Sequence, residues 1–237
     1  PYFINQTDAL LKKEETMESV YIADLYDLTQ TMAAELFEGK DFPWEVLPDI
    51  GDWIMQKGPT LDTEIYEQQG QGIWIARTAS IASTASITGP VIIGEYTEVR
   101  PGAFIRGKVL VGSYCVVGNS TELKNVILFN NVQVPHYNYV GDSILGYKSH
   151  MGAGSITSNV KSDKKPVIVK GLKERWETGF KKFGAMLGDH VEVGCGSVLN
   201  PGTVVGRNTN IYPLTSVRGV IPSDSIVKTM ENIVDKE

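Results

Sequence analysis

One titratable imidazole stands in a segment rich in polar side chains. His136 lies in the run of residues 134–142, which also holds a phenol at Tyr139. An imidazole titrates near neutral pH, which suits it to take a proton from a nucleophile. A lone histidine is more often structural than catalytic. His136 therefore becomes a candidate base only if other polar groups gather beside it.

The elements that must position these groups are indicated by a six-residue repeat of aliphatic residues. The repeat runs through Ile75, Ile81, Ile87, Ile93, Val99, Ile105, Val111, Val117 and Leu123, and it returns as Leu187, Val193, Leu199, Val205, Ile211 and Val217. This period is typical of a β-solenoid, in which each repeat forms one flat side of a coil. Glycine often follows the aliphatic residue, as at Gly94 and Gly112. Such glycines predict sharp corners at which a Cβ would be crowded or φ would be positive.

The spacing of the repeat changes around His136, from six residues to eleven and later to five. With these changes retained, alignment of the coils places Asn119, His136 and Ala153 in one column. Glu122 is placed beneath Tyr139 in the next coil. We therefore expect an imidazole, a carboxylate, a phenol and an amide to meet on neighbouring coil faces.

The first part of the chain, residues 1–72, lacks the repeat. Apolar residues at three- and four-residue steps predict a helix over residues 17–38, followed by a shorter one over residues 44–54. The Gln/Gly-rich residues 68–72 are expected to form a linker. This segment could bind a partner or organise an oligomer, but we favour a cap over the open end of the solenoid.

The second domain, residues 73–237, is predicted to be the solenoid. A Lys-rich stretch at about residues 161–184 breaks the repeat, so we expect it to leave the coil as a loop or hairpin. A run of charge is usually solvated surface. At the rim of a solenoid, however, such an excursion often lines a binding groove.

Composition excludes several functional classes. The net charge of −6 argues against nucleic acid as the main partner, because a phosphate backbone needs a basic face. Cys115 and Cys195 are widely spaced and form no CxxC pattern, so we expect partly buried wall residues in a reducing compartment rather than a disulfide framework or a zinc site. No signal-peptide pattern and no apolar stretch of ~20 residues is present, which predicts a cytoplasmic protein without a membrane span.

A metal centre of the kind found in solenoid carbonic anhydrases needs a cluster of histidines. His136, His150 and His190 are the only three histidines of the chain. The coil alignment places them on different sides, so no metal site is expected.

Four sequence runs carry a family resemblance. They follow one another as Arg-Pro-Gly-Ala at residues 100–103, Gly-Asn-Ser-Thr-Glu-Leu-Lys at 118–124, His-Tyr-Asn-Tyr-Val-Gly-Asp at 136–142 and Gly-Ala-Gly-Ser-Ile-Thr-Ser-Asn at 152–159. Together they resemble the acetyltransferase domain of the bifunctional glucosamine-1-phosphate acetyltransferase / N-acetylglucosamine-1-phosphate uridyltransferase, over roughly residues 73–217. The chain is still more similar to the solenoid tails of sugar-phosphate nucleotidyltransferases related to UDP-N-acetylglucosamine pyrophosphorylase. Those tails share the Lys-rich stretch and the run at residues 183–189.

The resemblance implies a left-handed parallel β-helix that transfers acetyl from acetyl-CoA to the amine of glucosamine-1-phosphate or a related amino-sugar phosphate. It also implies a homotrimer with the cofactor groove between subunits, and no metal. His136 matches the general base of the family, and Glu122 and Asn159 match polar residues close to the reacting amine. Ala153 and Cys195 match positions where the family lines its acetyl-CoA groove with small residues.

The remaining matched positions concern the sugar phosphate. Arg100 and Lys124 match phosphate-holding cations, Tyr139 a further phosphate or sugar contact, and Lys165 a phosphate-binding lysine across the loop. His150 stands where the family usually has an asparagine. Arg offers a planar fork and Lys a point charge, and both recognise phosphate.

Two departures leave the function open. Besides His150, the family's Asn-Tyr-Asp becomes Asn159-Val160-Lys161, so the site could accept a different amino-sugar phosphate or be inactive. No nucleotidyltransferase domain and no Gly-rich nucleotide loop precedes Ile73, so nucleotidyl transfer by this chain is not expected. The alternative is a non-catalytic scaffold or regulatory subunit, which would bind sugar phosphates or nucleotide sugars and assemble with a separate nucleotidyltransferase.

Overall fold

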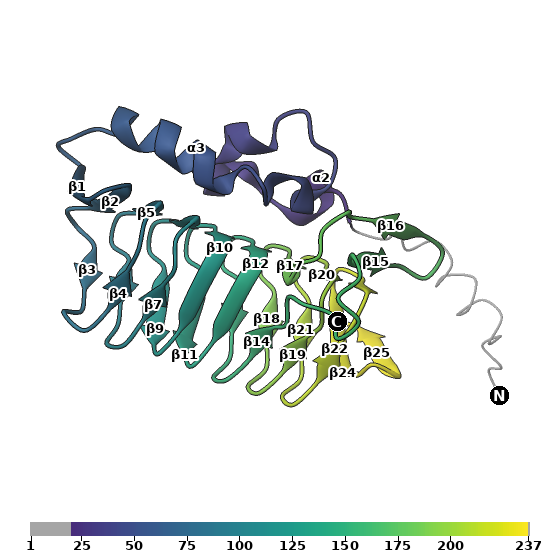
Figure 1. Ribbon diagram of the computed structural model, residues 1–237. Coiled ribbons are helices and arrows are strands. Elements are labelled where there is room, and N and C mark those ends of the chain that lie inside the picture. Colours follow the sequence, from purple (N-terminus) through teal and green to yellow (C-terminus); the bar gives the residue numbers. More distant parts are fainter. Residues whose placement is uncertain (1–19, 237) are drawn as a thin grey trace, which may run out of the picture.

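The computed structural model describes residues 20–236. Figure 1 shows a solenoid of stacked strands with a helical segment lying along its length. Each coil has three flat sides, and strands of successive coils pair in parallel along each side. In the described part of the chain, no helix combines the length and the apolar character needed to cross a bilayer.

The strands of each side are as follows. Side 1 contains β2 (Ile73–Ala76), β5 (Val91–Ile93), β8 (Val109–Val111), the second half of β10 (Glu122–Leu128), the second half of β12 (Tyr139–Leu145), β17 (Ala185–Leu187), β20 (Thr203–Val205) and β23 (Val220–Ile221). Side 2 contains β3 (Ser80–Ile81), β6 (Glu98–Val99), β9 (Val116–Asn119), β11 (Gln133–His136), β13 (His150–Met151), β18 (Glu192–Val193), β21 (Asn210–Ile211) and β24 (Ser225–Thr229). Side 3 contains β4 (Ser86–Ile87), β7 (Phe104–Ile105), the first halves of β10 and β12, β14 (Ile156–Thr157), β19 (Val198–Leu199) and β22 (Ser216–Val217).

The aliphatic repeat fills the interior of this prism. On side 1, Ile75, Ile93, Val111 and Leu128 follow one another in register from coil to coil, and all four are buried. Burial of one such side chain stabilises the fold by about 1.5–3 kcal/mol. Strands buried in this way have near-continuous apolar positions. The predicted fold class is confirmed: the chain is mainly β, a parallel β-solenoid with a small helical segment before it.

The change of spacing around His136 comes from shorter coils. Equivalent positions are 18 residues apart in the first coils, as for the hydrogen bond from Cys115 N–H to Thr97 Oγ1, but 17 apart around the candidate site. His136 pairs with Asn119, the register of Gln133 with His150 puts Ala153 next in that column, and Glu122 pairs with Tyr139. Both predicted alignments are therefore confirmed.

The glycines that follow the aliphatic residues have a steric role. A Cβ on Gly94 would lie 2.6 Å from the carbonyl carbon of Gly112 in the next coil, so only glycine lets the two backbones approach. Of the two predicted reasons for these glycines, the crowded Cβ is the one that applies, because Gly94 and Gly112 do not have positive φ. Positive φ falls instead on turn residues such as Tyr114 (φ 59°) and Asn131 (φ 63°), and asparagine adopts this region more readily than most residues.

The helical segment before the solenoid differs from the expected pair of helices. It contains α2 (Ile22–Leu25), η1 (Leu28–Gln30), η2 (Ala34–Phe37), η3 (Pro43–Val46), α3 (Ile50–Lys57) and η4 (Gly58–Thr60). The continuous helix predicted over residues 17–38 is wrong where the structure describes it, because the backbone is already extended at Tyr26, after one turn. Residues 17–19 lie outside the described part of the chain.

This segment packs along the solenoid and does not cap its end, so the favoured cap is wrong. Helix α3 contacts β5, β8 and β10, strands of successive coils, and Figure 1 shows the same lengthwise arrangement. The rings of Tyr26 and Phe37 lie 5.1 and 5.9 Å from that of Phe129. Apolar side chains of the segment pack against this solenoid face as well as against each other, as Tyr26 does with Phe37 at 6.2 Å between ring centroids. The division into two domains, residues 1–72 and 73–237, stays a prediction.

The Gln/Gly-rich stretch is not a linker. Residues Tyr66–Gly70 form β1, which pairs antiparallel with β2. At the other end of the solenoid, β25 (Asn232–Asp235) pairs antiparallel with β24. These strands occupy backbone groups that would otherwise form open sheet edges.

The Lys-rich stretch leaves the coil as a hairpin. Its strands β15 (Ile168–Lys170) and β16 (Arg175–Glu177) pair antiparallel with each other and form their own small sheet. Val167 and Val169 are fully buried, so the hairpin is anchored by apolar contacts. It is a docked element of the fold.

Candidate active site

The chemistry-bearing residues gather at two corners of the prism. The His136 corner joins sides 2 and 3, where β11 ends. The Asp142 corner joins sides 3 and 1, where β10 and β12 run from one side to the next without a break. At this second corner Asn125 and Asp142 have φ of 56° and 48°, whereas the equivalent residue of the preceding coil is Gly107 (φ 85°). The site therefore begins where polar residues replace glycine in a left-handed turn.

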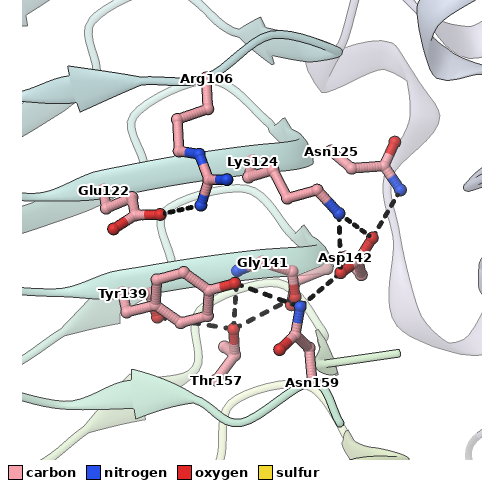
Figure 2. Close-up of polar contacts among 10 residues, drawn as sticks. Arg106, Glu122, Lys124, Asn125, Tyr139, Gly141, Asp142, Thr157 and Asn159 are labelled. Atoms are coloured by element: carbon pink, nitrogen blue, oxygen red, sulfur yellow. Dashed lines mark hydrogen bonds and ion pairs between the residues drawn. The ribbon is translucent and has the colours of Figure 1, made fainter. Parts of the chain in front are cut away.

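Asp142 is the centre of a buried polar cluster (Figure 2). Its side chain is 5% exposed, and its oxygens accept from Lys124 Nζ (3.2 and 3.4 Å), Asn125 Nδ2 (3.0 Å) and Asn159 Nδ2. A buried carboxylate is tolerated only when it is paired in this way. Asn125 Oδ1 is buried and accepts no hydrogen bond from any described residue. The cluster thus keeps one unpartnered acceptor.

Tyr139 joins the same cluster. Asn159 Nδ2 donates to its phenol oxygen at 3.1 Å. Burial raises the pKa of Tyr139, and the carboxylates of Asp142 and Glu122 raise it further. A phenol held in this way stays protonated at neutral pH, so its O–H remains available as a donor.

Two further contacts complete the cluster. Arg106 NH1 lies 2.5 Å from Glu122 Oε1, in the coil below Tyr139. Thr157 Oγ1 accepts from the N–H of Gly141 at 2.9 Å. A Cβ on Gly141 would lie 2.5 Å from the phenol oxygen of Tyr139, so this glycine makes room for the ring.

His136 stands at the other corner and is exposed. Its backbone is held by Asn138, whose Oδ1 accepts from the N–H of His136 at 3.1 Å. Asn138 is 2% exposed and also donates to the carbonyl oxygens of Gly152 (2.8 Å) and Ser155 (3.1 Å). No described residue makes a hydrogen bond to the imidazole. The ring is thus presented to solvent on a rigid backbone.

The small residues expected at a cofactor groove follow His136 along the same corner. The N–H of Gly154 donates to the carbonyl of His136, and the N–H of Gly196 to that of Ala153. Ala153 and Cys195 are both exposed. The expectation of a partly buried thiol is wrong for Cys195, because it points out of a turn.

Three of the predicted substrate-binding residues lie away from the Asp142 cluster. Arg100 follows β6 near the His136 corner and pairs with Glu98 at 3.1 Å. His150 lies on side 2 with its Nδ1 2.9 Å from Glu192 Oε2. Lys165 is exposed in the excursion.

The expectation that the three histidines occupy different sides is wrong. His136 in β11 and His150 in β13 both lie on side 2, and His150 and His190 line one cavity of about 450 Å³ together with Glu192. Within residues 20–236, no group of three or more His, Cys, Asp or Glu side chains could hold a metal ion.

Several residues of the site were missed in the sequence. Arg106 lies one coil before Lys124, so the coil period could have selected it in place of Arg100. Asn125 and Asp142 stand where a neighbouring coil has glycine, which is a usable signal. Asn138 carries no such signal, because its role depends on carbonyl oxygens of the next coil.

The order of the motifs and the geometry of the coils agree with one known family. A family model described as the GMPPB C-terminal domain matches residues 87–221. The chain belongs to this family. Bifunctional protein GlmU of Methanococcus aeolicus is 35% identical to it over 174 residues, which cover 66% of this chain and 42% of that protein. These matches confirm the resemblance predicted from the motifs.

Other similarities of this GMPPB C-terminal domain chain are more distant. The bifunctional sugar-1-phosphate nucleotidylyltransferase/acetyltransferase of Sulfurisphaera tokodaii is 31% identical over 189 residues, covering 72% of the chain and 43% of the relative. A hexapeptide transferase family protein of Anaplasma phagocytophilum is 19% identical with a TM-score of 0.40, over 70% of this chain and 81% of that one. The chain thus spans less than half the length of these curated relatives.

Proposed function

We propose that this chain is an acetyl-CoA-dependent N-acetyltransferase for an amino-sugar phosphate, with glucosamine-1-phosphate as the first candidate. One observation carries the proposal: two neighbouring short coils pair His136 with Asn119 and Tyr139 with Glu122. This register puts an exposed imidazole at one corner of the same short coils whose next corner holds a polar cluster able to hold a sugar, so that a second copy of the chain can bring the two together. The name of the Sulfurisphaera tokodaii relative, which combines acetyl transfer with sugar-1-phosphate chemistry, supports the same class.

In the proposed reaction His136 is the general base. The substrate amine attacks the carbonyl carbon of the thioester, and the imidazole takes the proton that the nitrogen loses. The carbon–sulfur bond breaks, and coenzyme A leaves as a thiolate that takes up a proton. The exposed imidazole can reach a substrate, and its hydrogen-bonded backbone limits its movement.

The Asp142 cluster is the proposed sugar-phosphate site. Arg106 and Lys124 are its cations, and each is paired with a carboxylate that a phosphate would partly replace. The protonated phenol of Tyr139 and the unpartnered Asn125 Oδ1 suit sugar hydroxyls. In this proposal Glu122 and Asn159 lie closest to the reacting amine.

A homotrimer is part of the proposal. His136 and the Asp142 cluster occupy different corners, and no hydrogen bond between described side chains connects them. A neighbouring subunit can bring its own corner to the other, and Arg100, His150 and Lys165 would then contribute across that interface. Ala153 and Cys195 would line the acetyl-CoA groove, since both are small and exposed beside His136. The proposed transfer needs no metal.

The test is thiol release from acetyl-CoA by the purified chain, measured against a panel of amino-sugar 1-phosphates. We expect turnover with at least one acceptor and none when His136 is replaced by alanine. Calorimetry with the same acceptors distinguishes the alternative. Saturable binding of a sugar phosphate with no thiol release for any acceptor would contradict the proposal and favour the scaffold or regulatory subunit.

A further inference from the structure

A second cavity, of about 520 Å³, lies between the hairpin excursion and the Asp142 corner of later coils. Lys161, Asp163 and Lys170 of the excursion form one wall, and Asn200 and Arg218 of the solenoid form the other. The cavity shares none of its residues with the Asp142 cluster. One of its lining residues, Ser158, directly precedes Asn159 of that cluster in the sequence.

The strand register connects this cavity to the proposed site. Arg106, Lys124, Gly141, Ser158, Asn200 and Arg218 occupy the same position in successive coils. Successive coils are about 4.8 Å apart, so Ser158 lies about 10 Å from Lys124 along this column. This column has cations at both ends, Arg106 and Lys124 at one end and Arg218 at the other. The hairpin lies beside Arg218.

The hairpin wall is built into the fold. A Cβ on Gly202 would lie 2.8 Å from Cγ1 of Val167, and one on Gly219 would lie 2.5 Å from the carbonyl oxygen of Lys170. These glycines therefore allow the hairpin to pack closely against the solenoid. With Val167 fully buried, the lysine-bearing wall is held in place and is more than solvated surface.

The charge of the cavity is opposite to that of the chain. The chain has a net charge of −6, yet three cations and one carboxylate line this space. Lys161 is paired with Asp163 at 3.1 Å. Lys170 and Arg218 have no ion-pair partner among residues 20–236. Two free cations on opposite walls of one cavity attract an anion that can bridge them.

We propose that this cavity binds a diphosphate group, with the guanidinium of Arg218 on one side and the ammonium groups of Lys161 and Lys170 on the other. The diphosphate can belong to a free nucleotide or to a nucleotide-linked amino sugar whose sugar reaches Asn159. The second source rests on the proposed acetyl transfer, whereas binding of the diphosphate itself does not. The other polar side chains that line the cavity are Ser158, Ser162 and Asn200, together with the carboxylate of Asp163, which is paired with Lys161.

The experiment is calorimetric titration of the full chain with inorganic pyrophosphate, then with a nucleoside diphosphate. We expect saturable binding with one site per chain, weakened about tenfold or more by R218A and separately by K170A. K181A is the matched control, because it removes the same charge from an exposed position of the excursion outside the cavity. Equal binding by R218A and K181A, or no saturable binding by the wild-type chain, would overturn the proposal.

Acetyl-transfer kinetics distinguish the two sources of the diphosphate. For a nucleotide-linked substrate, R218A should raise KM about tenfold with little change in kcat, and KM for a sugar monophosphate should not change. A free-nucleotide site would leave both KM values unchanged while pyrophosphate binding is lost, and would therefore support the cavity but overturn its role in substrate binding. H136A should retain pyrophosphate binding, so failure of the proposed catalysis is distinguishable from failure of this site.

Discussion

Lys124 Nζ lies 3.2 Å from Asp142 Oδ1, in the coil that follows its own. The two side chains differ in environment, because the carboxylate is 5% exposed and the lysine 27%. The pair therefore joins two short coils at the corner where a neighbouring coil has glycine, and it holds Lys124 in the proposed sugar-phosphate site. Its geometry depends on both coils keeping the same register.

Replacing Asp142 with asparagine should lower the free energy of unfolding by about 1–3 kcal/mol. Loss of one partner of a buried pair costs about 3–5 kcal/mol, and the partial exposure of Lys124 reduces this cost. Urea denaturation measures the change. Glu98→Gln is the matched control, because its pair with Arg100 is far more exposed and should contribute about 0–1 kcal/mol. Equal losses in the two variants would contradict a special role for the cluster.

His136→Ala should reduce kcat for acetyl transfer by about 10²–10⁴-fold, as expected for loss of a general base. The side chain is exposed, so the free energy of unfolding should change by no more than about 0.5 kcal/mol. Steady-state kinetics measure the change in kcat, and urea denaturation measures the change in the free energy of unfolding. Gln133→Ala changes another exposed residue of β11 and should leave kcat unaltered. A loss of stability in His136→Ala that matches its loss of activity would argue for a structural role.

Gly118→Ala should prevent correct stacking of β9 and β11. A Cβ there would lie 1.6 Å from the carbonyl oxygen of Pro135, a backbone atom that cannot move aside. We expect a loss of more than about 3 kcal/mol or an insoluble chain. Gly154→Ala provides the comparison, because it adds a Cβ to open space and only its φ of +70° is unfavourable. That variant should lose about 1–2 kcal/mol, and similar thermal midpoints for the two would refute the steric argument.

The two cysteines should react very differently with iodoacetamide. Burial raises the pKa of the Cys115 thiol to about 12, while Cys195 is exposed. At pH 8 mass spectrometry should find label on Cys195 only, and on both residues after unfolding. Acetyl-CoA should slow the labelling of Cys195 if the proposed groove is correct. Rapid labelling of Cys115 in the folded chain would contradict the buried assignment.

The same thiol makes stability depend on pH. The unfolded Cys115 loses its proton near its usual pKa of 9.0, whereas the folded residue keeps it until about pH 12. Between these values the folded state binds more protons, so the contribution of Cys115 to stability falls as pH rises through this window. Cys115→Ala should remove that part of the slope in denaturation measured from pH 8 to pH 11. An unchanged slope would show that other groups cause it.

Much of the fold and part of the site could be predicted because the coil is locally periodic. The six-residue repeat predicts which residues are buried, and its changed spacing places Asn119 under His136 and Glu122 under Tyr139. This works because backbone pairing between coils sets the register of every residue at once.

The sequence by itself therefore determined the solenoid, the two short coils and the pairs of residues that stack between them. Only the tertiary structure decided which corner each side chain occupies, and it selected Arg106 in place of Arg100 beside Glu122. It also decided that the helical segment lies along the solenoid, because an apolar face does not specify the surface that covers it. The Asp142 cluster joins residues of four coils through side-chain contacts. Such contacts depend on the direction of each side chain at a corner, which a repeat in the sequence does not contain.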